Sequence, residues 1–382
     1  MRKVLFVTTV GGFVPQFELN DVKILQDMGY EVHYCANFKR MVYDVDTAVF
    51  KNYNIKTHQI DIHSSPRQIG ANIKAFRQLR KLLHQEKFDL IHCHTPMGSV
   101  LARMAAAGKK CKVIYSCHGF HFGKGMPLIN WVFLIPERLL ARVTDCIVTI
   151  NKEDYSRAKR FHLRKGGFVA IVPSVGLDTD KFYPDEAAGQ EYRKEHNISP
   201  HTFHIVSVGE LNDNKNHISV INALSELKEY DFLYTICGDG TNRQYLTNAI
   251  QDLGLENKVK LAGYERNVSR VLQSADCFVF PSIREGLGMA AIEALACGIP
   301  VVAGDCRGSR EYILPGKNGY MCAPKDIKGY SGIIKYLMDN PGKVKALSKN
   351  CRASVLKFDK MKTSVIMREV YEKIDSSIDK GI

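Results

Sequence analysis

The sequence has few of the features that mark secreted or membrane-spanning proteins. Its 382 residues include a single tryptophan, and its eleven cysteines are scattered without a Cys-x-x-Cys pair. Unpaired, scattered cysteines argue against a disulfide framework and a zinc ribbon, and they fit a reducing compartment. The longest apolar stretch after the first strand, Met126–Pro136, is much shorter than the ~20 residues that span a bilayer. We therefore expect a soluble, cytoplasmic protein without a transmembrane segment.

Motifs for two other kinds of chemistry are also missing. No serine lies in a Gly-x-Ser-x-Gly elbow, so acyl transfer through a serine nucleophile is not expected. The first expected strand is followed by Gly11-Gly12 and not by a full Gly-x-Gly-x-x-Gly, which disfavours a dehydrogenase.

Positive charge is concentrated in the first half of the chain. Lysine and arginine exceed aspartate and glutamate by 13. Residues 1–184 hold 27 basic and 15 acidic side chains, whereas residues 185–382 hold 26 and 25. A one-sided excess favours an anionic surface or substrate for one half of the molecule over nucleic acid along the whole chain.

Short apolar runs alternate with helical patterns along both halves of the chain. In the first half we expect a helix at Phe17–Met28 and strands at Val4–Val10, Val32–Ala36, Leu90–Cys93, Val113–Cys117 and Cys146–Ile150. After a polar linker, further strands are expected at 204–208, 233–237, 259–261, 277–280 and 300–303. This alternation predicts the α/β class, with parallel sheets covered on both faces.

We predict a two-domain organisation from this repetition. Two facing Rossmann-like domains, at residues 1–184 and 185–360, would enclose an interdomain cleft, since such sheets bind ligands at the carboxyl ends of their strands. Residues 361–382 are expected to form a helix that crosses back to the N-terminal domain.

The segment Pro281–Ala303 carries the most specific chemical signal. A loop with Gly286 and Gly288 follows an expected strand, and a helix is expected to begin near Gly286. Glycines at a helix amino end let backbone N–H groups approach an anion. Glu285 and Glu293 are about two helical turns apart, so their carboxylates could accept hydroxyl protons from two parts of one extended ligand.

The stretch from Glu285 to Glu293 resembles the E-x7-E signature of retaining nucleotide-sugar glycosyltransferases of family 4, which have the GT-B fold. The resemblance covers nearly the whole chain, because Gly11-Gly12, His118, Lys215 and Gly238-Asp239-Gly240 follow in the expected order. The chain is most similar to bacterial enzymes that build capsule, exopolysaccharide or lipid-linked glycans.

The resemblance implies roles for individual residues. Glu285 and His118 would lie at the reaction centre beside the donor sugar, Glu293 would bind the ribose hydroxyls, and Lys215 would neutralise the diphosphate. The other donor-binding positions that it implies are the backbone amides of Gly286, Leu287 and Gly288, the first-domain loop at Gly12, and a base contact at Tyr264 and Arg266.

One position departs from the family pattern. Gly209-Glu210-Leu211 has a carboxylate where the family often has arginine, and a carboxylate there would repel a diphosphate. Either Glu210 turns away, or another cation compensates; Arg307 and Arg310 are the candidates.

Two histidine pairs invite a metal-binding interpretation. His92-x-His94 and His118-x-x-His121 have the residue type of metal ligands, but no acidic partner is clustered with them in the sequence. We expect structural or substrate-facing histidines, no metal, and no cofactor other than the nucleotide-sugar co-substrate, a UDP-sugar.

The segment Met126–Pro136 contains Trp131 and is flanked by basic clusters. One cluster, Arg77, Arg80 and Lys81, is expected on the outer face of a helix whose apolar face is Ile69, Ile73, Phe76 and Leu83. An aromatic, apolar segment beside cations suits an anionic membrane interface and a polyprenyl-pyrophosphate acceptor. Burial in the core explains the same pattern, and the sequence leaves both open.

The function implied is a retaining, metal-independent transfer of a hexose or N-acetylhexosamine from a UDP-sugar to a lipid-linked glycan at the inner face of the plasma membrane. Two alternatives stay open: a nucleotide-sugar epimerase of the same architecture, and a non-enzymatic protein that binds sugar nucleotides or nucleic acid. The carboxylates Glu285 and Glu293 argue against nucleic acid, because they would repel a phosphate backbone.

Overall fold

The computed structural model divides into two compact units, and it describes residues 1–41, 46–123, 126–173 and 175–379. The first unit comprises Met1–Gly176 and Lys360–Ile382, and the second comprises Leu177–Asp359. The expected border at 184/185 falls inside the second unit. Residues 177–184 belong there because the N–H of Leu177 donates to the carbonyl of Phe358 (2.7 Å) and Arg352 donates to the carbonyl of Phe182 (2.7 Å).

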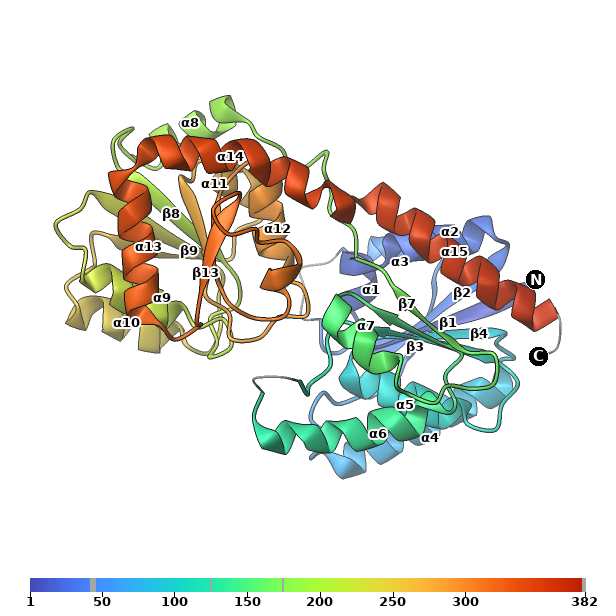
Figure 1. Cartoon of the computed structure of the whole chain (residues 1–382). Helices are drawn as coiled ribbons and strands as arrows, with labels where there is room; N and C mark the ends of the chain where they lie inside the picture. The colour runs from blue at the N-terminus through green and yellow to red at the C-terminus, as the bar shows by residue number, and fades with distance from the viewer. Residues whose placement is uncertain (42–45, 124–125, 174, 380–382) are drawn as a thin grey trace. The chain divides into compact units, whose positions relative to one another are not determined.

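The first unit is built on a seven-stranded parallel sheet with the strand order β3-β2-β1-β4-β5-β6-β7 (Figure 1). Its strands are β1 (Arg2–Val10), β2 (Tyr30–Asn37), β3 (Lys56–Gln59), β4 (Leu90–Cys93), β5 (Lys112–Cys117), β6 (Cys146–Thr149) and β7 (Phe168–Ile171). Its helices are α1 (Phe13–Phe17), α2 (Leu19–Asp27), α3 (Ala48–Asn52), α4 (Ile69–Gln85), α5 (Pro96–Ala106), η1 (Leu128–Phe133), α6 (Leu134–Ala141), α7 (Lys152–Ala158) and α15 (Lys360–Asp379).

The second unit repeats this design with six parallel strands in the order β10-β9-β8-β11-β12-β13. The strands are β8 (Phe203–Val208), β9 (Phe232–Cys237), β10 (Val259–Gly263), β11 (Cys277–Phe280), β12 (Val301–Gly304) and β13 (Gly319–Cys322). The helices are α8 (Glu186–Glu195), α9 (His217–Ser225), α10 (Arg243–Asp252), α11 (Val268–Gln273), α12 (Met289–Ala296), η2 (Ser309–Glu311), α13 (Ile327–Asp339), α14 (Pro341–Val355) and η3 (Leu356–Phe358).

The predicted α/β class, with two parallel sheets, is confirmed. In both units the chain order reverses beside a central strand: β1 has β2 on one side and β4 on the other, and β8 has β9 and β11. Loops at the carboxyl ends of such neighbouring strands diverge to opposite faces of the sheet and leave room for a ligand. These two switch points position the residues described below.

The final helix, α15, packs on the first unit, where it runs beside α2 (Figure 1). Its apolar stripe is buried in the same core as β1 and α2, and consists of Met367, Val370, Tyr371 and Ile374. Residues 380–382, the end of the helix expected at 361–382, lie outside the described residues. Within the described part of the chain, no helix combines the length and the apolar character needed to cross a bilayer.

Two predicted helical features differ from the structure. The helix expected at Phe17–Met28 is interrupted at Glu18, which has a φ of −120° and separates α1 from α2. On α4 the predicted apolar face is correct at Phe76 and Leu83, which pack in the core, but wrong at Ile69 and Ile73, which are 67% and 46% exposed.

Candidate active site

At the switch point of the second unit, a lysine and a glutamate from two loops form an ion pair. Lys215 lies in the loop that follows β8, and Glu285 lies in the loop that follows β11. Lys215 Nζ is 2.7 Å from Glu285 Oε1 and 4.7 Å from the centre of the Phe280 ring. The lysine side chain is 22% exposed, so it is held in place but still accessible.

The loop from Glu285 to Gly288 leads directly into α12. Gly288 precedes the helix with φ +97°, and a Cβ at this position would lie 2.7 Å from Phe280 and 2.9 Å from Tyr312 Oη. Only glycine fits this conformation and this space. The predicted helix start near Gly286 was wrong, because α12 begins at Met289. Glu285 and Glu293 are therefore not on one helix, and only Glu293 is.

Glu293 is partly buried on α12. Burial raises the pKa of its carboxyl to about 7, and the charge of Lys181 opposes this shift. A carboxyl group with this pKa changes its charge state near neutral pH, and its ionised form accepts hydroxyl protons well.

Glu210, the carboxylate at the position where the family often has arginine, is exposed. Of the two cations considered as its replacement, Arg310 pairs with Asp305 (2.6 Å), whereas Arg307 donates to the backbone carbonyl of Glu285 (3.3 Å). Arg307 is thus the cation that the structure brings to the Glu285 loop.

Several buried polar atoms around these loops have no hydrogen-bond partner among the described residues. They are Asn214 Oδ1, both ring nitrogens of His217, Ser282 Oγ and Tyr312 Oη. Buried polar groups are normally paired, and unpaired ones concentrate where a ligand or water completes the site. This second-unit cluster was not predicted, because its members are separated in the sequence and none belongs to a motif.

Two glycines explain the close approach of neighbouring loops. A Cβ at Gly238 would lie 2.0 Å from the carbonyl oxygen of Gly209, and one at Gly240 would lie 2.5 Å from that of Leu211. The Gly238-Asp239-Gly240 turn therefore has a packing role beside the Lys215 loop. Tyr264 and Arg266 follow β10 at the edge of the sheet, where Tyr264 is 68% exposed.

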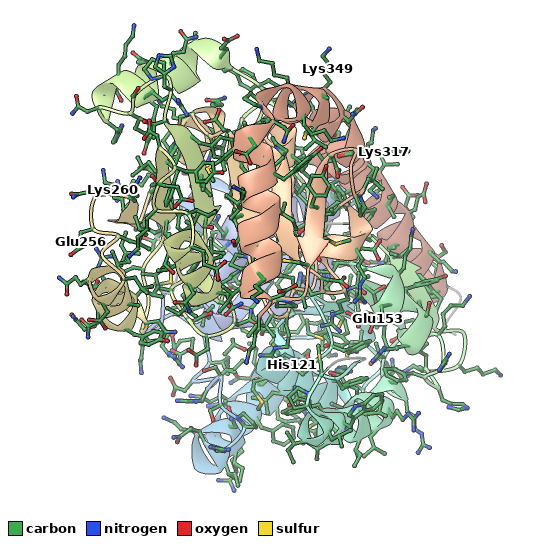
Figure 2. All side chains as sticks on the ribbon, turned by 60° about the vertical axis from the view of Figure 1, so that its left-hand side comes forward. His121, Glu153, Glu256, Lys260, Lys317 and Lys349 are labelled. Carbon is green, nitrogen blue, oxygen red and sulfur yellow. The ribbon has the colours of Figure 1, made fainter. Side chains whose placement is uncertain are left out.

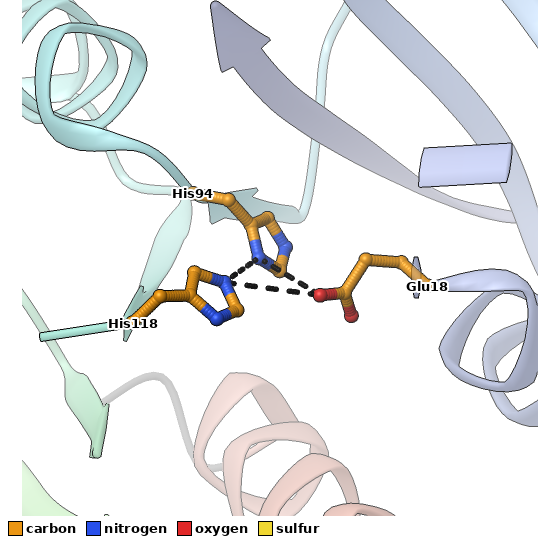
Figure 3. Close-up of side chains that lie close together, drawn as sticks. All are labelled: Glu18, His94 and His118. Atoms are coloured by element: carbon orange, nitrogen blue, oxygen red, sulfur yellow. Dashed lines mark hydrogen bonds and ion pairs between the residues drawn. The ribbon is translucent and has the colours of Figure 1, made fainter. Parts of the chain in front are cut away.

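In the first unit, three side chains meet at the carboxyl ends of β4 and β5 (Figure 3). His94 Nδ1 lies 3.2 Å from His118 Nε2 and 3.4 Å from Glu18 Oε1. Glu18 comes from the junction of α1 and α2. Phe13, which follows Gly12, packs its ring against both histidines at 5.6 and 5.3 Å. Gly12 has an ordinary φ of −83° and precedes α1.

A second chain of hydrogen bonds continues from this cluster into the core. Tyr371 Oη donates to Asp21 Oδ2 (2.8 Å) and contacts His92 Nδ1 (2.9 Å), while His92 Nε2 contacts Ser116 Oγ (2.8 Å). Burial raises the pKa of Glu18, and that of Asp21 to about 6, and the two carboxyl groups are hydrogen-bonded. Burial also lowers the pKa of His118 to about 4.

The prediction that no acidic side chain accompanies these histidines is wrong, because Glu18 lies beside His94 and His118. Glu18, His94 and His118 each offer one ligand atom, all within 4.8 Å of one another. However, ligation through His94 Nδ1 would leave the proton of that ring on Nε2, which is buried without an acceptor. The absence of a metal stays a prediction. His121 is not in the group: it is exposed, with its ring 5.7 Å from Phe133 (Figure 2).

The apolar segment with Trp131 forms η1 and α6, and it is exposed. Leu128 and Ile129 are 86% and 76% exposed, and Trp131 is 42% exposed. Of the two interpretations, burial in the core of its own unit is therefore wrong. The basic residues of α4 are on the exposed face as predicted: Arg77, Arg80 and Lys81.

Comparison with known proteins assigns the family. Residues 22–178 match the family described as "Glycosyltransferase Family 4", and residues 189–354 match the family described as "Glycosyl transferases group 1". EpsD of Bacillus subtilis (strain 168), which is named as a glycosyltransferase, is 35% identical over 377 residues, covering 97% of this chain and 96% of EpsD. The chain therefore belongs to the glycosyltransferases of group 1 and family 4.

Two further proteins define the relationship. The UDP-Gal:alpha-D-GlcNAc-diphosphoundecaprenol alpha-1,3-galactosyltransferase of Escherichia coli is 26% identical over 318 residues, 81% of each chain. The structure of HepE from Anabaena in complex with UDP-glucose covers 98% of this chain and 100% of HepE, with a TM-score of 0.77 and 19% identity. The likeness shows the GT-B fold, as predicted. The family assignment sets aside the epimerase and non-enzymatic alternatives.

Some site residues were missed in the sequence although a signal was present. Glu18 and Asp21 share the helical stripe of Val22 and Leu25, and both are buried. Acidic residues on the apolar face of a helix need partners, which is a recognisable sign of a buried polar network. Tyr371 lies likewise on the apolar stripe of α15.

Proposed function

We propose that this glycosyltransferase moves a hexose or N-acetylhexosamine from a UDP-sugar to a polyprenyl-diphosphate-linked glycan, with retention of configuration and without a metal. The observation that carries this proposal is the 2.7 Å pair of Lys215 and Glu285. In a nucleotide diphosphate sugar the outer phosphate is bonded directly to the sugar. A cation for the phosphate and a carboxylate for a sugar hydroxyl must therefore lie side by side, as these two groups do.

The neighbouring groups fit the rest of such a donor. Backbone N–H groups of Gly286, Leu287 and Gly288, in the loop that leads into α12, bind the diphosphate, since the amino end of a helix attracts anions. Glu293 in its ionised form accepts the ribose hydroxyls, and Arg307 adds positive charge beside the Glu285 loop. Gly12, Tyr264 and Arg266 keep the donor contacts that the family resemblance implies.

The proposed reaction needs no nucleophile from the protein. The bond from the sugar C1 to the phosphate oxygen breaks, and the acceptor hydroxyl oxygen bonds to C1 on the same face. The acceptor proton passes to the leaving phosphate oxygen. Lys215 and the loop amides stabilise the charge that develops on this phosphate, and His118 contacts the donor sugar.

The acceptor class is supported by the relative from Escherichia coli, whose name specifies a diphosphoundecaprenol-linked sugar. The η1–α6 segment supports the same class of acceptor, because it buries a charged side chain and exposes its apolar ones. Its polar side chain Glu137 faces inward to the fully buried Arg103 (2.9 Å), whereas Leu128, Ile135 and Leu139 are more than half exposed. An apolar outer face beside exposed arginines suits insertion into an anionic interface.

This membrane contact gives a direct prediction. Replacing Leu128 and Ile129 together by serine should weaken binding to anionic vesicles at least tenfold, because the inserted apolar surface is lost. The control is the double replacement of Met361 and Val365, which are also exposed, on α15. Cosedimentation with vesicles measures the effect. Equal binding of both variants would contradict a membrane role for η1–α6.

The transfer itself is tested with purified protein, a panel of UDP-hexoses and UDP-N-acetylhexosamines, and an undecaprenyl-diphosphate-linked sugar as acceptor. We expect a lengthened glycan from one donor, with the anomeric configuration of the donor retained in the NMR spectrum of the product. Transfer should be lost in Lys215→Ala but kept in Lys349→Ala, an exposed lysine of α14 (Figure 2). Turnover of the donor without an acceptor, or an inverted product, would overturn the proposal.

A further inference from the structure

His118 is held from behind by a second histidine. Its contacts to His94 and Glu18 both use Nε2, at 3.2 and 3.9 Å, so its other nitrogen, Nδ1, lies on the far side of the ring (Figure 3). Among the described residues no group accepts a hydrogen bond from Nδ1. The side chain is 26% exposed, which leaves it accessible to a ligand.

His94 has a preferred protonation pattern because of its surroundings. Its side chain is fully buried, and its Nε2 has no hydrogen-bond partner. A buried N–H without an acceptor is rarer in proteins than a buried acceptor without a donor. The proton of the neutral ring therefore resides on Nδ1, which faces His118 Nε2 and Glu18 Oε1.

The groups behind His94 preserve this arrangement. Glu18 is hydrogen-bonded to Asp21, and Asp21 accepts the hydroxyl proton of Tyr371 at 2.8 Å. Burial lowers the pKa of His94 well below its usual value, so its ring is neutral near pH 7, and burial raises the pKa of the Glu18 carboxyl. The Phe13 ring closes the other side of the two histidines.

We propose that His94 is a positioning residue that sets the tautomer of His118, by donating its Nδ1–H to His118 Nε2. His118 then carries its own proton on Nδ1 and offers a hydrogen-bond donor outward in place of a lone pair. The inference rests on the proposed function for one point, the contact of His118 with the donor sugar. A fixed N–H at this place donates to a sugar oxygen, and the opposite tautomer would offer it only an acceptor.

The tautomer is measured without reference to activity. In full-length protein labelled with ¹⁵N-histidine, long-range ¹H–¹⁵N spectra distinguish protonated from unprotonated ring nitrogens, and His118→Gln identifies the signals of His118. Near neutral pH we expect a protonated Nδ1 and an unprotonated Nε2 on His118 in the wild-type protein. A protonated Nε2 would overturn the proposal, as would signals showing that both histidines bind a metal ion that a chelator removes.

Two substitutions of His94 separate positioning from simple structural loss. His94→Asn keeps an N–H donor close to the position of Nδ1, whereas His94→Leu removes it. In His94→Leu we expect His118 to lose its single tautomer and kcat to fall on the order of tenfold or more, as for other outer hydrogen-bond partners of site residues, with little change in the KM for the donor.

His94→Asn should restore both the tautomer and most of kcat. If both variants keep the wild-type tautomer and the same kcat, His94 has no positioning role. A changed tautomer with unchanged kcat would separate the two claims: His94 would still set His118, but the proposed contact of His118 with the sugar would be wrong.

Discussion

At the scale of single residues, Lys215 and Glu285 form an ion pair, and these are the two charges to which we assign the phosphate and the sugar of the proposed donor. Glu285→Ala should lower transfer more than it lowers nucleotide affinity, because the carboxylate is assigned to the sugar and not to the nucleotide. Steady-state transfer and UDP titration on the same variant measure the two effects. Glu256→Ala, an exposed glutamate (Figure 2), is the matched control. Unchanged transfer in Glu285→Ala would remove this residue from the site.

Glu293 gives donor binding a dependence on pH. Its pKa is raised to about 7, so its carboxyl is protonated as pH falls below neutral. In the proposed site the ionised form accepts the ribose hydroxyls, so the Kd for UDP-glucose should rise as pH falls from 8 to 6, by up to about tenfold for each unit below the pKa. Glu293→Gln should have weak binding without this slope. A slope of the same size in Glu293→Gln would assign the titration to another group.

Single residues also show which parts of the site could be predicted from the sequence. Glu285, Lys215 and Glu293 belong to motifs, so their presence in one unit could be predicted. Glu18 could not be joined to His94 and His118, because the junction of α1 and α2 that turns it toward them depends on the fold. The same holds for Tyr371, which reaches His92 only because α15 packs on the first unit.

At the scale of elements, the hydrogen bonds of Tyr371 tie α15 to α2 and β4. Tyr371→Phe leaves Asp21 and His92 without this partner and should lower the free energy of unfolding of the first unit by about 1–3 kcal/mol. The only tryptophan, Trp131, lies in this unit, so its fluorescence in a urea titration reports the transition. Tyr245→Phe, at an exposed tyrosine of α10, should change little. Equal stability of Tyr371→Phe and wild type would refute the importance of this network.

Strands at the centre of each sheet were predicted, whereas three of the four edge strands were missed and only the edge strand β10 was expected, at 259–261. The buried strands β4 and β11 have the predicted bounds, because they are continuous apolar runs. The strands β3, β7 and β13 were missed, and all three are edge strands. An edge strand is covered less completely, so its sequence needs fewer apolar residues, and Lys56–Gln59 is wholly polar. This reason does not apply to β7, because Phe168–Ile171 is an apolar run.

At the scale of the whole molecule, the uneven charge and the two switch points favour different substrates for the two units. The basic first half carries the exposed apolar segment η1–α6, which fits an anionic lipid-linked acceptor. The second half is nearly neutral in net charge and has Lys215 and Arg307 on the loops around Glu285, which fits a single diphosphate. The central claim that follows is that the second unit binds a uridine diphosphate sugar.

Calorimetric titration of the full-length protein with UDP, GDP and ADP tests this claim most directly, with Glu293→Ala and the control Glu256→Ala alongside. We predict that UDP binds most tightly, that Glu293→Ala weakens this binding at least tenfold, and that Glu256→Ala leaves it unchanged. Absence of binding to all three nucleotides, or equal affinity of Glu293→Ala and wild type for UDP, would contradict the account.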